Sequence, residues 1–184
     1  MRRSLQSAYA IAMLVAVLLP ALPSRAETLA EIEGLSLVVD WTQRVTGQDP
    51  SGQYFTNDSH STHRYYISSK GNVFDYPASS NPANRGPQVF AVGRTQDRGN
   101  GFTVSWSMTD GHLTTVLKYP QGSTDHILAI DPLHLTCALE IRHHYDPQTG
   151  LLTPQTPAGV FKLRAVETLT SSCAVKRGNI FAGD

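Results

Sequence analysis

The feature that most limits what this chain can fold into is a two-residue alternation of apolar and polar side chains, repeated between short turns. Between residues 102 and 109, apolar side chains alternate with serine and threonine. Asp110-Gly111 follows, which is the strongest short-range signal for a tight hairpin, and residues 113–119 return. A period of two is typical of strands that bury one face. The chain is therefore predicted to be built from antiparallel β-strands.

Similar patterns recur along most of the sequence. Further strands are expected at 36–42, 61–69, 73–76, 88–92, 124–130, 133–141 and 161–176. The only helical signal is the capping-box spacing of Thr28 and Glu31 before Gly34, which predicts at most two helical turns over 28–33. Polar and Pro/Gly-rich composition predicts loops at 46–60, 77–87 and 146–158.

Seven to nine strands joined in sequence must bury one face and protect their edges. A closed up-and-down barrel and a two-sheet sandwich are the common solutions. The sequential hairpins favour an all-β antiparallel meander closed into a barrel of about eight strands, similar at the level of fold to lipocalins and avidins. A β-sandwich is the alternative.

Residues 1–26 have the layout of a secretory signal peptide. Arg2 and Arg3 precede the apolar run 8–22. Ser24 and Ala26 then provide the small residues that a cleavage site after Ala26 requires. The run is shorter than the roughly 20 residues of a spanning helix, so cleavage is favoured over a membrane anchor. Residues 27–184 would remain as a single β domain in the periplasm or outside the cell, with no membrane span.

Charge argues against polyanionic partners. Acidic and basic residues balance at fifteen each, and the only charged side chains among residues 1–26 are arginines. The mature chain is therefore mildly acidic. No basic field exists to attract a nucleic acid, and we expect no nucleic-acid partner.

The chain contains two cysteines, Cys137 and Cys173. Both fall on the apolar face of a predicted strand, and an exported protein meets an oxidising compartment. An even count without a C-x-x-C motif favours one disulfide over a redox pair. We therefore predict a Cys137–Cys173 disulfide.

The two ends of the mature chain carry a family resemblance. Residues 34–42 (GLSLVVDWT) and 172–183 (SCAVKRGNIFAG) resemble the ends of small exported proteins of alphaproteobacteria, which share the signal peptide and a closing Gly-Asn-x-Phe. The resemblance covers the ends better than the middle. It implies an exported protein of this size, and it implies no chemistry.

Motifs for catalysis or metal binding are scarce. The sequence has no nucleophile elbow, P-loop, dinucleotide fingerprint, EF-hand or H-E-x-x-H. Asp58, His60 and His63 could ligate zinc or copper only if they lie in a loop, because a strand would turn the two histidines to opposite faces. His143 and His144 also face opposite ways at a strand end. We expect no metal, no cofactor and no catalytic residues, and we regard these histidines as solvated.

Aromatic side chains are the best candidates for ligand contact. Trp41 and Trp106 lie on predicted inward faces, and Tyr65 and Tyr66 follow one another in a strand. Core packing explains them equally well, but the inner face of a barrel is also its ligand face. We expect a non-enzymatic protein that binds a small ligand near one end of the barrel. An envelope protein-interaction module is the alternative, and a hydrolase is a distant third.

Overall fold

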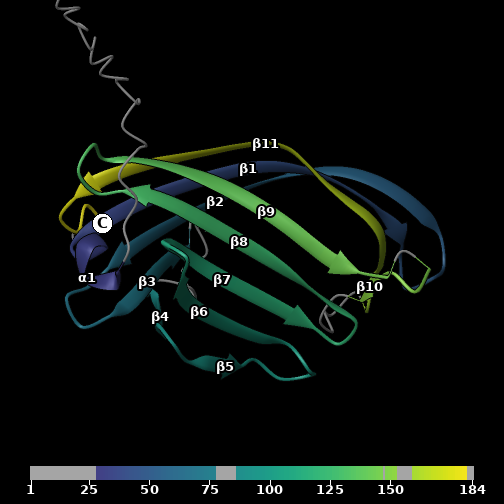
Figure 1. Cartoon of the computed structure of the whole chain (residues 1–184). Coiled ribbons are helices and arrows are strands. Elements are labelled where there is room, and N and C mark those ends of the chain that lie inside the picture. The colour runs from purple at the N-terminus through teal and green to yellow at the C-terminus, as the bar shows by residue number, and fades with distance from the viewer. Residues whose placement is uncertain (1–27, 78–85, 147, 153–158, 182–184) are drawn as a thin grey trace, which may run out of the picture.

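The computed structural model describes residues 28–77, 86–146, 148–152 and 159–181. This part of the chain is almost entirely β-structure with one short helix (Figure 1), so the all-β prediction is confirmed. The predicted signal peptide, residues 1–26, and most of the predicted loop 77–87 lie outside the described residues. The elements are α1 (Leu29–Ile32), β1 (Leu35–Gln48), β2 (Tyr54–Ile67), β3 (Asn72–Pro77), β4 (Gln88–Ala91), β5 (Thr95–Asp97), β6 (Thr103–Thr109), β7 (His112–Tyr119), β8 (Gly122–Asp131), β9 (Thr136–Tyr145), β10 (Leu151–Leu152) and β11 (Lys162–Arg177).

The strands form two antiparallel sheets. One has the order β10-β11-β1-β2-β3-β4, and the other has the order β5-β6-β7-β8-β9. Pairing of β1 with β11 brings together the two segments that carry the family resemblance. Ser36 of β1 fixes this junction, because its hydroxyl donates to the carbonyl of Gly178 (2.6 Å) and accepts from the N–H of Ile180 (3.2 Å).

The predicted closed barrel is wrong. First and last long strands do pair, as in an up-and-down barrel, but the backbone ladder is interrupted at two places. Between β4 and β5 the chain passes from one sheet to the other through Gly93, whose positive φ turns the backbone. Between β9 and β11 the two sheets lie side by side, but no backbone ladder joins them (Figure 1). Two sheets that do not close are consistent with the β-sandwich alternative.

Several predicted boundaries are also corrected. The predicted loop 46–60 is instead a long hairpin, because β1 continues to Gln48 and β2 begins at Tyr54. Alternation within the predicted strand 133–141 places Leu133 on the inward face with Cys137, but Leu133 lies in the turn before β9 and is 69% exposed. Alternation within 161–176 places Leu169 inward with Cys173, yet Leu169 is the extra residue of a β-bulge opposite Thr42 and Gln43 and is 37% exposed. A bulge shifts the alternation by one residue, which a strict period of two cannot anticipate.

Two local predictions are confirmed. The main-chain N–H of Thr28 donates to the carboxylate of Glu31 (3.1 Å), which ties down the start of α1 as the capping-box spacing predicts. Asp110 and Gly111 join β6 to β7 with φ of 50° and 74°. Two successive positive φ angles are the signature of the tight turn that suits the twist of a hairpin.

The space between the sheets is filled unevenly. Near α1 it holds a solid aliphatic core, since the side chains there are almost completely buried: Ile32, Leu35, Leu37, Ile67, Val73, Leu113, Leu128 and Ile130. Further along the same strands the inward side chains become aromatic and polar. The packed end therefore holds the sheets together, and the other end is less densely filled.

The predicted disulfide lies between the two sheets. Cys137 of β9 and Cys173 of β11 have sulfur atoms at bonding distance and Cα atoms 5.5 Å apart. Beside it the hydroxyl of Ser171 donates to the carbonyl of Leu139 (3.2 Å). These contacts join β9 to β11 where the backbone ladder is missing. Within the described residues, no helix has the length and apolar character needed to cross a bilayer.

Candidate functional site

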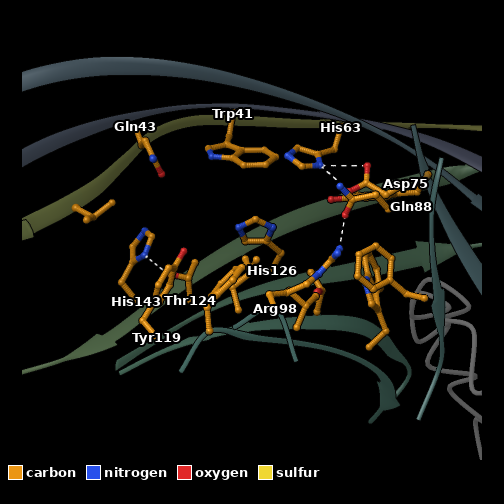
Figure 2. A pocket seen from close by; sticks show the side chains of 18 of the residues that line it. Trp41, Gln43, His63, Asp75, Gln88, Arg98, Tyr119, Thr124, His126 and His143 are labelled. Carbon is orange, nitrogen blue, oxygen red and sulfur yellow. Dashed lines mark hydrogen bonds and ion pairs between the residues drawn. The ribbon is translucent and has the colours of Figure 1, made fainter. Parts of the chain in front are cut away.

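A cleft of about 640 Å³ lies between the two sheets, beyond the aliphatic core (Figure 2). Both sheets contribute to its walls. The lining side chains are Trp41, Gln43, His63, Tyr65, Asp75, Gln88, Phe90, Arg98, Phe102, Val104, Trp106, Thr115, Leu117, Tyr119, Thr124, His126, His143, Leu163 and Val166.

Aromatic rings form the boundary between the core and the cleft. The Trp41 ring stacks on His63, with ring centres 5.1 Å apart, and meets the ring of His126 nearly edge-on at 4.8 Å. Tyr65 contacts Trp106 in a T-shaped arrangement at 5.0 Å. Interlocked rings hold their orientation with little loss of side-chain entropy on binding. The cleft therefore has a rigid aromatic wall.

In the sheet β5-β6-β7-β8-β9, the strand register places the polar groups of the cleft wall in rows. Trp106, Thr115 and His126 are successive partners across β6, β7 and β8. A second row ends with Thr124 of β8 and His143 of β9. Since partners on one face of a sheet are neighbours, the local pairing alone gathers these side chains on the cleft wall.

His126 lies in the middle of the cleft, below Trp41 (Figure 2). Its side chain is only 8% exposed, and it makes no hydrogen bond to any described residue. Burial, together with smaller effects of the nearby His63 and His143, lowers its pKa to about 3. The imidazole is therefore neutral at ordinary pH, with one donor and one acceptor nitrogen.

Other buried polar atoms on this wall also lack a partner. Within the described part of the chain, Trp106 Nε1, Thr115 Oγ1 and His143 Nε2 are buried and make no hydrogen bond. The other ring nitrogen of His143 shares a hydrogen bond of 3.0 Å with the hydroxyl of Thr124. Burial lowers the pKa of His143, and His144 lowers it further. Buried polar atoms are nearly always paired in folded proteins, so this cluster is an unusual cost for the fold to carry behind the wall of the cleft.

Charged groups gather at one end of the cleft. The Nδ1 of His63 lies 3.3 Å from both carboxylate oxygens of Asp75. Arg98 donates to the amide oxygen of Gln88, and its guanidinium lies 5.1 Å from the centre of the Phe90 ring. Among the described residues, the carboxylate of Asp75 therefore has an imidazole as its partner, and the guanidinium of Arg98 has an amide oxygen and an aromatic ring.

A hairpin turn holds the backbone of Arg98 in place. Its N–H donates to the carbonyl of Phe102 (2.8 Å), and the N–H of Gly99 donates to the carboxylate of Asp97 (2.8 Å). These bonds close the turn between β5 and β6. Arg98 therefore extends toward the cleft from a fixed position.

The structure brings together three of the four predicted ligand contacts. Trp41, Tyr65 and Trp106 line the cleft and are 6%, 3% and 2% exposed. Burial raises the pKa of Tyr65 well above 10, and Asp75 adds to this effect. Tyr66 is not part of the cleft, since it faces away from its neighbour Tyr65 and contacts Phe74. The cleft lies between the sheets, whereas the sequence predicts a site among loops at the end of a barrel.

The weak metal candidates are not brought together. Arg44 donates to both carboxylate oxygens of Asp58. On the outer face, the Nε2 of His60 lies 3.7 Å from a carboxylate oxygen of Asp40. His63 points to the cleft. Because β2 is continuous here, the two histidines face opposite sides, which excludes a shared metal. Over the described ranges, no cluster of three His, Cys, Asp or Glu side chains could hold a metal ion.

Several cleft residues are missing from the prediction. The most informative is His126, which occupies an inward position in the same alternation as Leu128 and Ile130. A polar residue on an apolar strand face was visible in the sequence. His143 was predicted to be solvated, but it faces the cleft, while His144 points outward to Asp125 (3.0 Å).

Comparison with protein-family models, curated proteins and solved structures finds no match for this chain. The resemblance to exported alphaproteobacterial proteins therefore stays a prediction. Function has to be argued from the geometry and chemistry of the cleft.

Proposed function

We propose that this protein is an exported, non-enzymatic binding protein that holds a small organic ligand in the cleft between its sheets. The observation that carries the proposal is the cleft itself. Its volume of about 640 Å³ falls within the range of roughly 300–1,000 Å³ typical of small-molecule sites. A core that merely packed two sheets together would fill this space with side chains.

The polar atoms of the cleft support a ligand over a packing defect. His126 and the unpartnered atoms of Trp106 and Thr115 lie in one cross-strand row. Each buried polar group without a partner costs about 1–3 kcal/mol. Of these groups, the imidazole of His126 is the one that a ligand with a polar edge would meet, because the polar atoms of Trp106 and Thr115 are fully buried. Aromatic walls with a few polar groups are also the common composition of small-molecule sites.

The arrangement of the histidines supports binding without turnover. Thr124 and His143 form a hydroxyl–imidazole pair, but His143 Nε2 has no carboxylate partner among the described residues. The imidazole–carboxylate pair belongs to His63 and Asp75 instead. Hydroxyl activation as in a triad needs both contacts on one histidine, and here they are divided between two.

Export is supported by the disulfide and by the signal-peptide pattern of residues 1–26. Cysteines at bonding distance are typical of proteins that fold in an oxidising compartment.

Native mass spectrometry tests the proposal. Protein purified from the exported fraction of the cells that make it should carry a small additional mass, which is lost on denaturation. The variant His126→Phe, which removes the central polar group, should lose that mass. The matched variant His144→Phe changes a histidine that faces away from the cleft and should keep it.

A second measurement uses the fluorescence of tryptophan. The chain has two tryptophans, Trp41 and Trp106, and both line the cleft. A low-molecular-weight extract of the same fraction should change their fluorescence. If neither measurement detects a small molecule, the proposal is wrong. Co-purification of an envelope protein without a small molecule would favour the interaction module instead.

A further inference from the structure

The charge at one end of the cleft indicates which class of ligand it would take. Of the lining side chains, only Asp75 and Arg98 carry a full charge independent of histidine protonation. Asp75 is held by His63 at 3.3 Å. Arg98 has no carboxylate within ion-pair distance in the described residues, and its hydrogen-bond partner is the neutral Gln88. Arg98 is therefore the cationic side chain of this lining that no carboxylate of the described residues engages.

Arg98 is also suited to bind an anion by its geometry. A guanidinium presents five N–H donors, of which the bond to Gln88 uses only one. Its Cζ lies 5.1 Å from the centre of the Phe90 ring, and this cation–π contact favours the observed position of the guanidinium. The hairpin turn fixes its backbone. An arginine held in this way can donate two parallel hydrogen bonds to a carboxylate.

The remainder of the cleft suits an apolar body with flat rings. From the Arg98 end, the wall runs from Phe90 to Trp106 and then to Tyr65. The ring centres of Phe90 and Trp106 are 6.2 Å apart, and those of Trp106 and Tyr65 are 5.0 Å apart. On the sheet that carries Trp106, Leu117 and Val104 continue the apolar lining.

We propose that the ligand is a small organic acid, with its carboxylate bound by Arg98 and its ring-containing body lying along the aromatic wall. This inference rests on the proposed function and narrows the ligand to one chemical class. Ring stacking holds the body, and the head group selects for negative charge.

Three probes of one shape and different charge test this inference. Phenylpropionate, phenylpropanol and phenylpropylamine share a ring and chain but carry an anionic, a neutral and a cationic head. Each is titrated into the whole mature protein, and binding is followed by tryptophan fluorescence and confirmed by calorimetry. We expect phenylpropionate to bind roughly tenfold more tightly than phenylpropanol, because a charge-assisted hydrogen bond is stronger than a neutral one. Phenylpropylamine should bind most weakly.

Two variants assign the preference to one side chain. Arg98→Gln should reduce the affinity for phenylpropionate to that of phenylpropanol and leave the affinity for phenylpropanol unchanged. Arg94→Gln is the matched control, because it removes a nearby positive charge that does not line the cleft. It should preserve the preference. An effect of Arg98→Gln on all three probes alike would mean that Arg98 acts through packing, and it would overturn the inference.

The outcomes separate this inference from the proposed function. Equal binding of all three probes, or tightest binding of the amine, overturns the organic-acid assignment and leaves the binding function standing. Absence of binding by every probe also overturns it. In that case the bound mass sought by native mass spectrometry decides whether the proposed function fails as well.

Discussion

At the scale of single residues, His126 shows how the fold accommodates a site at the expense of stability. It occupies an inward position of β8, where Leu128 and Ile130 continue the apolar face. An aliphatic side chain would pack there without leaving polar atoms unpaired. A local rule broken at a cleft-lining position is what a binding site commonly requires.

The buried imidazole makes stability depend on pH in a defined direction. In the unfolded chain His126 has an ordinary pKa of 6.5, whereas in the folded protein it is lowered to about 3. The unfolded state therefore binds a proton that the folded state does not, and the free energy of unfolding falls as the pH falls from 6.5 toward 3. Between neutral pH and pH ~5, the loss from this residue is about 2 kcal/mol.

Denaturant unfolding of His126→Gln checks this prediction. Its free energy of unfolding should fall by about 2 kcal/mol less than that of the wild type over this pH interval. Carboxylates with lowered pKa, such as that of Asp131, also lose stabilisation in acid, but they are common to both proteins. His60→Gln, on the outer face, should behave like the wild type. Identical pH dependence in His126→Gln and wild type would mean that His126 is not a buried neutral imidazole.

At the scale of elements, the hairpin of β6 and β7 carries much of the cleft wall. Trp106, Thr115 and Leu117 belong to it, and their register follows from the two-residue turn at Asp110-Gly111. A shift of one residue between the strands would turn Thr115 and Leu117 to the outer face if Trp106 kept its place. The turn therefore determines part of the site from a distance.

Replacement of the turn glycine tests this dependence. Gly111 has a φ of 74°, where a Cβ atom costs roughly 1–2 kcal/mol. Gly111→Ala should lower the free energy of unfolding by that amount in denaturant titrations. Gly86→Ala is the control, since Gly86 has open space around it and no positive φ. If both variants were equally stable, the turn would not need its left-handed geometry.

Most strands could be predicted from the sequence, because alternation and turn residues depend only on neighbours within a few positions. The alternation placed the β6–β7 hairpin and the inward side of Cys137 correctly. It failed at the predicted loop 46–60, where the polar residues Asn57 and Asp58 continue β2 in register with Val45 and Arg44 of β1. It also failed at Leu169, where a bulge breaks the period.

At the scale of the whole molecule, the site depends on how the two sheets face each other. Trp41 and Tyr65 could be predicted because each faces inward on its own strand. Arg98 could not, since it lies in a turn and reaches the cleft only through the position of its hairpin relative to Phe90 and Gln88. The two interruptions of the ladder likewise follow from packing between distant strands, which no local period reports.

The disulfide should matter most where β9 and β11 meet without a backbone ladder. Cys137 and Cys173 are 36 residues apart, and closing a loop of that size contributes about 3–4 kcal/mol by the chain-entropy model. Reduction of the mature protein should therefore lower its free energy of unfolding by that amount. It should also lower the affinity for phenylpropionate, because only side-chain contacts such as that of Ser171 then join β9 to β11.

Thiol titration of denatured, unreduced protein should find no free thiol. The double variant Cys137→Ala/Cys173→Ala is the control, and reductant should not change its stability. Two free thiols, or a wild type insensitive to reductant, would show that the covalent bond does not hold the sheets together.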